Sequence, residues 1–218
     1  MRAVQLYDTT LRDGAQREGI SFTVADKLRI TARLDELGIH YIEGGWPGSS
    51  PKVDEFFRLA ESVELKNTKL TAFGSTCRHG IPAKDDANLK SLAACPVEWC
   101  CIFGKSWDFH VENALCIPLE ENLKLITESV RFLRESGKRV MFDAEHFFDG
   151  YMENREYALS ALKAAIDGGA EWVVLCDTNG GVMLDDVIDA VEDVRLSFDV
   201  QVGIHCHNDS DLAVANSL

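Results

Sequence analysis

The sequence has 218 residues, of which 46% are hydrophobic and 27% charged, a composition typical of a globular domain large enough for one sizeable core. Its net charge of −14 argues against nucleic acid or an anionic membrane surface as the main partner. A bound metal and a few local cations would still let a cleft accept a small anionic substrate.

Short apolar segments, typical of strands buried in a sheet, recur along the chain. The predicted strands are Ala3–Tyr7, Tyr41–Gly44, Leu70–Phe73, Glu98–Phe103, Arg139–Phe142, Trp172–Cys176 and Val200–His205. Segments with helical spacing of apolar residues separate them. The predicted helices are Val24–Leu37, Pro51–Ser62, Ala83–Ala93, Leu119–Ser136, Arg155–Asp167 and Leu184–Ser197, and 209–218 resembles the start of another. Thr23 is the expected N-cap of the first helix, and Gly38 its expected C-terminal glycine.

Strands that alternate with helices indicate a parallel α/β sheet, either doubly wound or closed into a barrel. Polar residues follow nearly every predicted strand, whereas a doubly wound sheet concentrates its site at one switch point. These residues lie in the segments Asp8–Asp13, Glu43–Trp46, Ser75–Arg78, Lys105–Trp107, Asp143–His146, Asp177–Asn179 and His205–Asp209. We therefore predict one catalytic domain over 1–218, a (β/α)8 TIM barrel truncated after about seven βα units.

The clearest candidate metal ligands are His205 and His207, which lie two residues apart at the end of a predicted strand. Residues i and i+2 of a strand point to the same face, so both imidazoles could reach one ion. They could equally be two histidines satisfied by other hydrogen bonds. Asp13, after the first strand, could ligate a metal beside Arg12, or could simply form a turn.

Other strand ends offer acid–base and anion-binding groups. Glu145, near Asp143, is a candidate general base, although it could be a solvated loop acid. Thr178 begins a Thr-Asn-Gly-Gly segment that could bind a carboxylate. Gly104-Lys105-Ser106 resembles the end of a phosphate-binding loop, but that motif needs glycine at the position of Trp99, so we exclude it.

Two motifs together carry a family resemblance. Asp8–Gln16 (DTTLRDGAQ) and His205–Asp209 (HCHND) resemble the metal-dependent barrel family that contains 2-isopropylmalate, homocitrate and citramalate synthases. The stretches EGGWPGS, FGKSW and CDTNGG are similar to the citramalate synthase branch. The match runs from Tyr7 to Leu218.

The resemblance implies an acyltransferase that condenses acetyl-CoA with a 2-keto acid, most simply pyruvate, to give citramalate and CoA. It implies that Asp13, His205 and His207 bind a divalent metal, Mg, Mn or Zn. By the same match, Arg12 binds the keto acid and stabilises the enolate, and Glu145 is the acid/base. Substrate contacts are implied for Gln16, Glu43, Asp143 and Thr178.

The sequence departs from the family pattern at its end. The eighth strand with its Asn ligand is missing, as are the C-terminal subdomains that complete the site of a neighbouring subunit. We therefore expect a homodimer for a full-length protein and little activity from this chain alone. Seven cysteines without a CxxC pair, no signal peptide and no long apolar run predict a cytoplasmic protein without disulfides.

Several rival functions stay open from the sequence. The keto acid could be that of a 2-isopropylmalate or homocitrate synthase, because a difference of one methylene changes discrimination by only about 1–3 kcal/mol. An acyl-CoA lyase or aldolase of the same fold would cleave, rather than form, the carbon–carbon bond. A non-catalytic fragment that binds metal without turnover is the remaining alternative.

Overall fold

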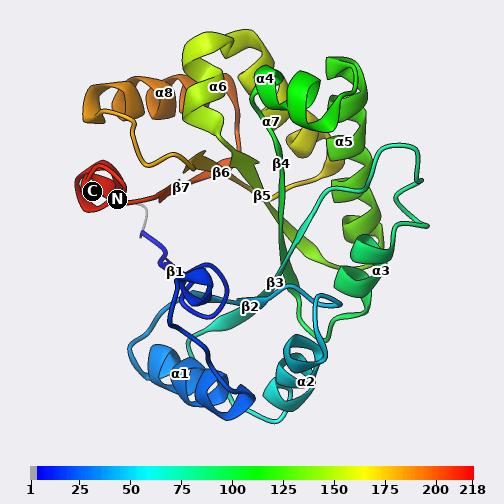
Figure 1. Cartoon of the computed structure of the whole chain (residues 1–218), viewed down its shortest axis with the longest axis vertical. Helices are drawn as coiled ribbons and strands as arrows, with labels where there is room; N and C mark the ends of the chain where they lie inside the picture. Colours follow the sequence, from blue (N-terminus) through cyan, green and yellow to red (C-terminus); the bar gives the residue numbers. More distant parts are fainter. Residues whose placement is uncertain (1–3) are drawn as a thin grey trace.

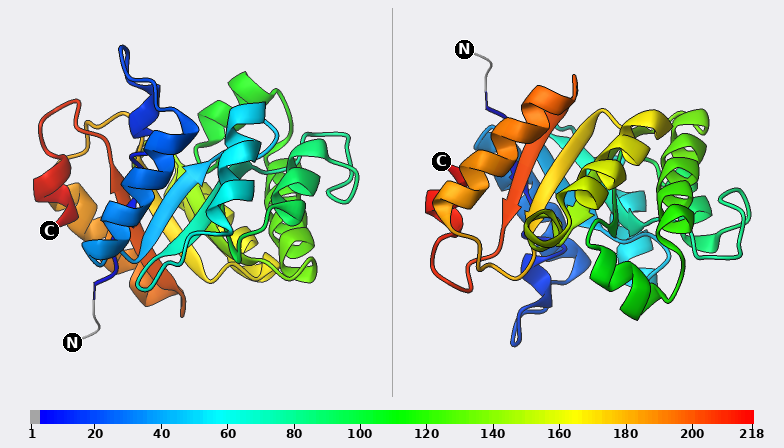
Figure 2. Two further views of the ribbon diagram at one scale, coloured as in Figure 1. Left: turned by 90° about the horizontal axis from the view of Figure 1, so that it is seen from below. Right: turned by 90° about the horizontal axis from the view of Figure 1, so that it is seen from above.

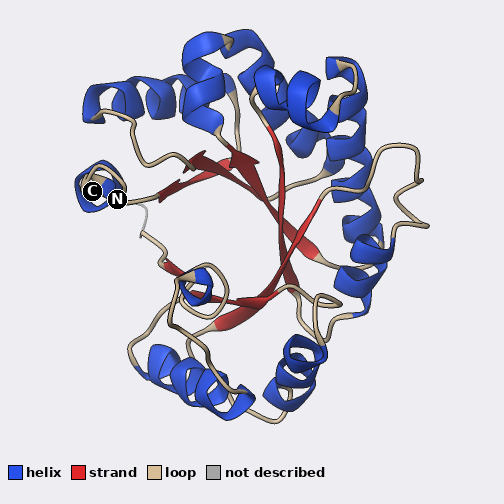
Figure 3. Ribbon diagram, viewed as in Figure 1, coloured by secondary structure: helices blue, strands red, loops and turns tan. Residues whose placement is uncertain are grey.

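The computed structural model describes residues 4–218 and shows a curled parallel sheet surrounded by helices (Figures 1 and 3). Its strands are β1 (Tyr7–Asp8), β2 (Tyr41–Gly45), β3 (Lys69–Ser75), β4 (Trp99–Lys105), β5 (Arg139–Glu145), β6 (Trp172–Asp177) and β7 (Gln201–Cys206). The α-helices are α1 (Val24–Glu36), α2 (Pro51–Ala60), α3 (Ala87–Ala94), α4 (Asp108–His110), α5 (Leu119–Glu135), α6 (Phe147–Glu153), α7 (Arg155–Gly168), α8 (Leu184–Ser197) and α9 (Ala213–Ser217). A 3₁₀ turn, η1 (Gly14–Gln16), and a π-helical turn, η2 (Val111–Leu115), complete the described elements.

The strands are hydrogen-bonded in chain order, β1 through β7, and every neighbouring pair is parallel. Within residues 4–218 no strand joins β7 back to β1, so both are edge strands, on either side of the opening seen in Figure 1. Figure 2 shows the helices lying along the outside of the strands. The arrangement confirms the predicted barrel, truncated after seven units. In the described part of the chain, no helix has the length and apolar character needed to cross a bilayer.

Two cores follow from the alternation of side chains along each strand. The larger one lies between the sheet and the helices and includes Phe56, Phe142 and Leu162. The smaller one consists of side chains that face the barrel interior: Tyr41, Phe73, Trp99, Cys101 and Met141. Odd-numbered residues of β2 to β5 thus point inward, so the polar residues at the ends of these strands can be assigned to a face.

The first strand is shorter than expected. Ala3 lies outside the described residues, and β1 itself covers only Tyr7 and Asp8. Val4 and Leu6 are 81% and 53% exposed, and the Leu6 N–H donates to Nδ1 of His40 instead of to a neighbouring strand. The reason is that β1 is an edge, with β2 as its one partner.

The predicted helix ends were confirmed at some positions and wrong at others. Thr23 caps α1 in a reciprocal arrangement with Asp26, and Gly38 adopts φ +79° just beyond its end. The helix predicted from Ala83 begins only at Ala87, because the Asp86 carboxylate caps it by accepting from the Leu89 N–H at 3.0 Å. The short helices α4 and α6 were missed, since three and seven residues show too little apolar periodicity to detect.

The Asp35 carboxylate of α1 joins that helix to the loop before β3. It is 6% exposed and accepts backbone N–H groups of Lys66, Asn67 and Thr68 at 2.8 to 3.1 Å. Burial alone would raise the pKa of Asp35, but these N–H groups outweigh it and lower the pKa below its ordinary value of 3.8.

Asp35→Ala is expected to lower the free energy of unfolding by about 2 kcal/mol, because one buried and two partly buried N–H groups lose a charged acceptor. The carboxylate stabilises the fold above pH 3.8, and this contribution is lost as the pH falls through the lowered folded pKa. Urea unfolding at several pH values measures both effects. Glu36→Ala, on the exposed face of the same helix, is the control, with a loss below about 0.5 kcal/mol. Equal losses in the two variants would contradict the assignment.

Candidate metal centre

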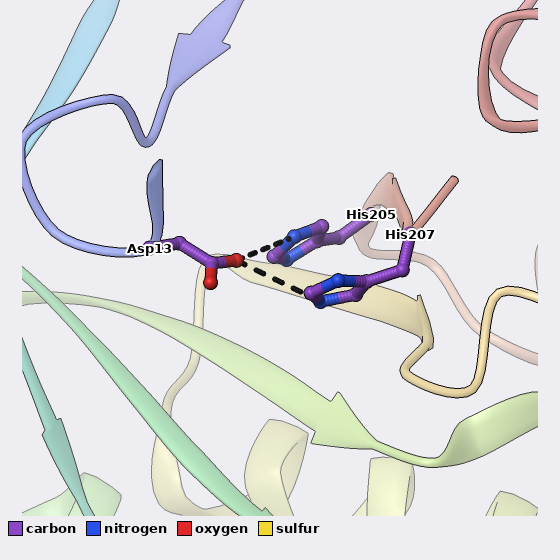
Figure 4. Close-up of side chains that lie close together, drawn as sticks. All are labelled: Asp13, His205 and His207. Atoms are coloured by element: carbon purple, nitrogen blue, oxygen red, sulfur yellow. Dashed lines mark ion pairs between the residues drawn. The ribbon is translucent and has the colours of Figure 1, made fainter. Parts of the chain in front are cut away.

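Asp13, His205 and His207, here called the ligand trio, converge at the open end of the barrel (Figure 4). Oδ2 of Asp13 lies 3.3 Å from Nε2 of His205 and 3.6 Å from Nε2 of His207. The two imidazole rings are nearly parallel, with centroids 5.0 Å apart. One ligand atom from each residue lies within 4.8 Å of the others, so the structure brings the three predicted ligands together.

Local backbone geometry explains how residues so far apart in sequence meet. After β1 the chain turns sharply, with the N–H groups of Arg12 and Gly14 both donating to the Thr9 carbonyl at 3.1 Å. This turn directs Asp13 toward the end of β7, as Figure 4 shows. On the other side, the His207 N–H donates to the Asp177 carbonyl at 3.1 Å and extends the β6–β7 ladder by one residue. Strand hydrogen bonds therefore fix the backbone that carries both histidines, and with it the direction in which each imidazole points.

The electrostatics of the trio favour a bound cation. The hydrogen bond to His205 is the main cause that lowers the pKa of Asp13, with burial opposing it and Arg12 adding to it. Burial alone would lower the pKa of His205, but Asp13 and the nearby Asp143 raise it overall. A divalent ion at these atoms would compete with protons for the same nitrogen and oxygen lone pairs.

The donor set fits a catalytic metal. Two imidazole nitrogens and one carboxylate oxygen suit zinc, manganese or similar divalent ions, and three protein ligands leave positions for a substrate. Asp143, Cys176 and His205 form a second set of potential ligand atoms within 4.8 Å of one another. Asp143 is 7% exposed and accepts a hydrogen bond from Cys101 Sγ at 3.1 Å. A carboxylate beside a ligating imidazole typically orients the ring.

Arg12 is held next to the trio by buried partners. Its Nε donates to Oε1 of Glu43, and its guanidinium carbon lies 3.7 Å from the centre of the Phe73 ring. Oε2 of Glu43 accepts from the Tyr7 hydroxyl at 2.7 Å. Burial raises the pKa of Glu43 to about 7, although Arg12 pulls it downward. The guanidinium thus has one defined orientation at the mouth.

Glu145 is the last residue of β5, and Thr178 lies in the loop that follows β6. Glu145 forms an ion pair with Lys105, and its side chain is 25% exposed. Thr178 Oγ1 accepts the backbone N–H of His146 at 2.9 Å, so its own hydrogen is free to donate to another group. Gly180, at φ +64°, lets this loop pass close to Asp209, because a Cβ there would lie 2.7 Å from its carboxylate.

The predicted site residues are not all buried in the site. Gln16 is exposed on η1, and its backbone N–H donates to the Asp13 carbonyl at 2.9 Å. Sequence reasoning assigned no role to Tyr7, Lys105 or Cys176, which all contact site residues or lie beside them. The signal that could have found them is the inward alternation along each strand, which places them on the same face as the candidate groups.

Residues 3–218 match the HMGL-like family, and the chain belongs to this family. A relative named (R)-citramalate synthase, from Aquifex aeolicus, is 55% identical over 99% of this chain and 41% of its own length. One named 2-isopropylmalate synthase, from Sulfolobus acidocaldarius, is 35% identical over 100% of this chain and 54% of its own length. The resemblance predicted from the two motifs is confirmed, and the chain spans about half the length of these relatives.

A crystal structure of an HMG-CoA lyase from Bacillus subtilis superposes with a TM-score of 0.79. The match covers 99% of this chain and 72% of that one, at 19% sequence identity. Similarity at this identity shows the barrel fold alone.

His207→Ala is expected to abolish tight binding of one divalent ion per chain, because the trio would be left with one imidazole and one carboxylate. Elemental analysis after dialysis, supported by calorimetric titration with Mn²⁺ or Zn²⁺, measures the loss. His79→Ala is the matched control, since His79 is exposed beside Glu121 and should leave metal content unchanged. Equal metal content in His207→Ala and the parent would refute the ligand assignment.

Proposed function

We propose that the protein containing this barrel condenses acetyl-CoA with a 2-keto acid, pyruvate before others, and hydrolyses the thioester to release citramalate and CoA. The supporting observation is that the ligand trio, Arg12 and Glu145 all belong to the C-terminal end of one parallel barrel. Identity of 55% to a citramalate synthase, against 35% to a 2-isopropylmalate synthase, favours pyruvate.

Asp13, His205 and His207 would hold the divalent ion, Mg, Mn or Zn. When bound, the ion would polarise the keto carbonyl as a Lewis acid and make its carbon a better electrophile. Arg12, held between Glu43 and Phe73, would bind the keto acid and the oxygen that becomes negative in the enolate. Its fixed position means that little reorganisation is needed during the reaction.

Glu145 would remove a proton from the acetyl methyl group, with the carbon–hydrogen electron pair moving toward the thioester oxygen. Thr178 would donate its free hydroxyl hydrogen to the keto-acid carboxylate. Glu43 would act through Arg12, and Asp143 through His205, in addition to the substrate contacts predicted for them. For Gln16, a substrate contact remains a prediction from the motif alone.

The assembly and location of the whole protein are part of the proposal. A homodimer in which a neighbour completes the site follows from the family resemblance. All seven cysteines are free, which is consistent with a reducing cytoplasm. Synthases for other keto acids, a lyase or aldolase, and a non-catalytic metal-binding chain are the rival outcomes of the assay.

The direct test measures CoA release from acetyl-CoA with a thiol reagent, using the full-length protein and a panel of pyruvate, 2-ketoisovalerate and 2-ketoglutarate. Pyruvate is expected to give the highest kcat/KM. Cleavage of hydroxymethylglutaryl-CoA without CoA release from acetyl-CoA would establish the lyase instead. Metal binding without turnover of any of these substrates would favour the non-catalytic alternative.

Glu145→Gln is expected to lower kcat by about 10² to 10⁴, because the amide cannot accept the methyl proton. Glu156→Gln, an exposed residue of α7, serves as the control and should retain parental kcat. Steady-state rates at saturating acetyl-CoA and pyruvate measure the effect. A Glu145→Gln variant as fast as the parent would remove Glu145 from the proposed chemistry.

A further inference from the structure

The last residues of β4 and β5 form an ion pair that none of the roles above uses. Lys105 and Glu145 stand opposite each other in the parallel register of these two strands. The Lys105 ammonium contacts Oε2 of Glu145, with the two side chains 20% and 25% exposed. Such partial burial strengthens an ion pair relative to a fully solvated surface pair.

Strand alternation places this pair inside the barrel mouth. Cys101 and Asp143 face the interior, because their side chains are buried and hydrogen-bonded to each other across the two strands. Lys105 is four residues beyond Cys101, and Glu145 is two beyond Asp143, so both point to the same interior face. The pair thus forms the outermost interior layer at the C-terminal end, where the ligand trio also lies.

The backbone on both sides of the pair is held in place. The Ser106 hydroxyl donates to the Glu145 carbonyl at 2.8 Å, and the side-chain amide of Asn122 donates to the Lys105 carbonyl at 2.9 Å. Ser106 and Asn122 are themselves buried. Because the backbone is held at both residues, the ammonium and the carboxylate lose less conformational freedom when they pair.

The side chains near Glu145 also include two histidines and a cysteine. His110 of α4 and His146 lie beside the pair, with ring centroids 4.4 Å apart, and His146 is itself paired with Asp149 of α6 at 3.1 Å. Cys176 of β6 faces Glu145, and burial keeps its thiol protonated by raising its pKa. Among residues 4–218, Lys105 is the one lysine or arginine that forms an ion pair with Glu145.

We propose that Lys105 is a positioning residue for the reaction: its ammonium holds the Glu145 carboxylate in one orientation inside the mouth. This inference rests on the proposed function, in which the acetyl C–H bond breaks and its proton moves to Glu145. Lys105 transfers nothing. A general base must lie within hydrogen-bond reach of the proton that it removes, and the ion pair holds the carboxylate in that place.

The test measures kcat and KM for CoA release in the full-length parent, Lys105→Met and Lys105→Arg. Without its partner the carboxylate loses its fixed orientation, so Lys105→Met should lower kcat about tenfold or more with little change in KM for either substrate. Lys105→Arg keeps the charge and should restore most of the parental kcat.

Two controls separate this role from a general loss of structure. Lys163→Met removes a lysine that pairs with Asp167 on the outside of α7, and should leave kcat and KM unchanged. In a Glu145→Gln background, Lys105→Met should lower kcat by less than about twofold, because residues that act as a unit are not additive. If Lys105→Met does not fold, Lys105→Arg and Lys105→Gln provide the same comparison of kcat and KM.

An unchanged kcat in a folded Lys105→Met variant would overturn the proposal, as would an equal loss in Lys105→Met with or without Glu145. A parent that releases no CoA with any keto acid would instead overturn the proposed function, and the two failures are thereby distinguished.

Discussion

The parallel register of the seven strands is the constraint on which the site depends. Parallel neighbours place all their C-terminal ends at one rim, and the strand pleat turns every second residue into the interior. Asp13 after β1 and His205 and His207 at β7 meet because the sheet curls until its two edges approach each other. A register slip of one residue in β7 would turn both imidazoles toward the helices.

The barrel mouth contains more acidic than basic side chains, and each acidic side chain has a different partner. Asp13 shares a hydrogen bond with His205, Glu43 is paired with Arg12, and Glu145 is paired with Lys105. For Asp143, burial raises the pKa, and Cys101 Sγ donates a hydrogen bond to the carboxylate at 3.1 Å. A divalent cation at the trio would compensate part of this charge.

Features that depend on nearby residues were predicted from the sequence better than features that depend on distant ones. The Thr23 cap, the Gly38 terminus and the α/β alternation depend on neighbours within a few residues, so their pattern is visible in the sequence. The start of α3 was misplaced because the Asp86 cap outweighs helical spacing from Ala83 onward. The length of β1 was misjudged because pairing, which decides it, depends on a distant strand.

By itself the sequence determined the fold class, the seven βα units and the identity of the candidate ligands, because apolar periodicity and the two motifs are properties of local order along the chain. Only the tertiary structure decided that Asp13 lies within 3.6 Å of both imidazole nitrogens, that Glu43 rather than solvent holds Arg12, and that Lys105 meets Glu145. The physical reason is that strand register and sheet curvature arise from contacts between residues tens to hundreds of positions apart, and no local pattern specifies those contacts.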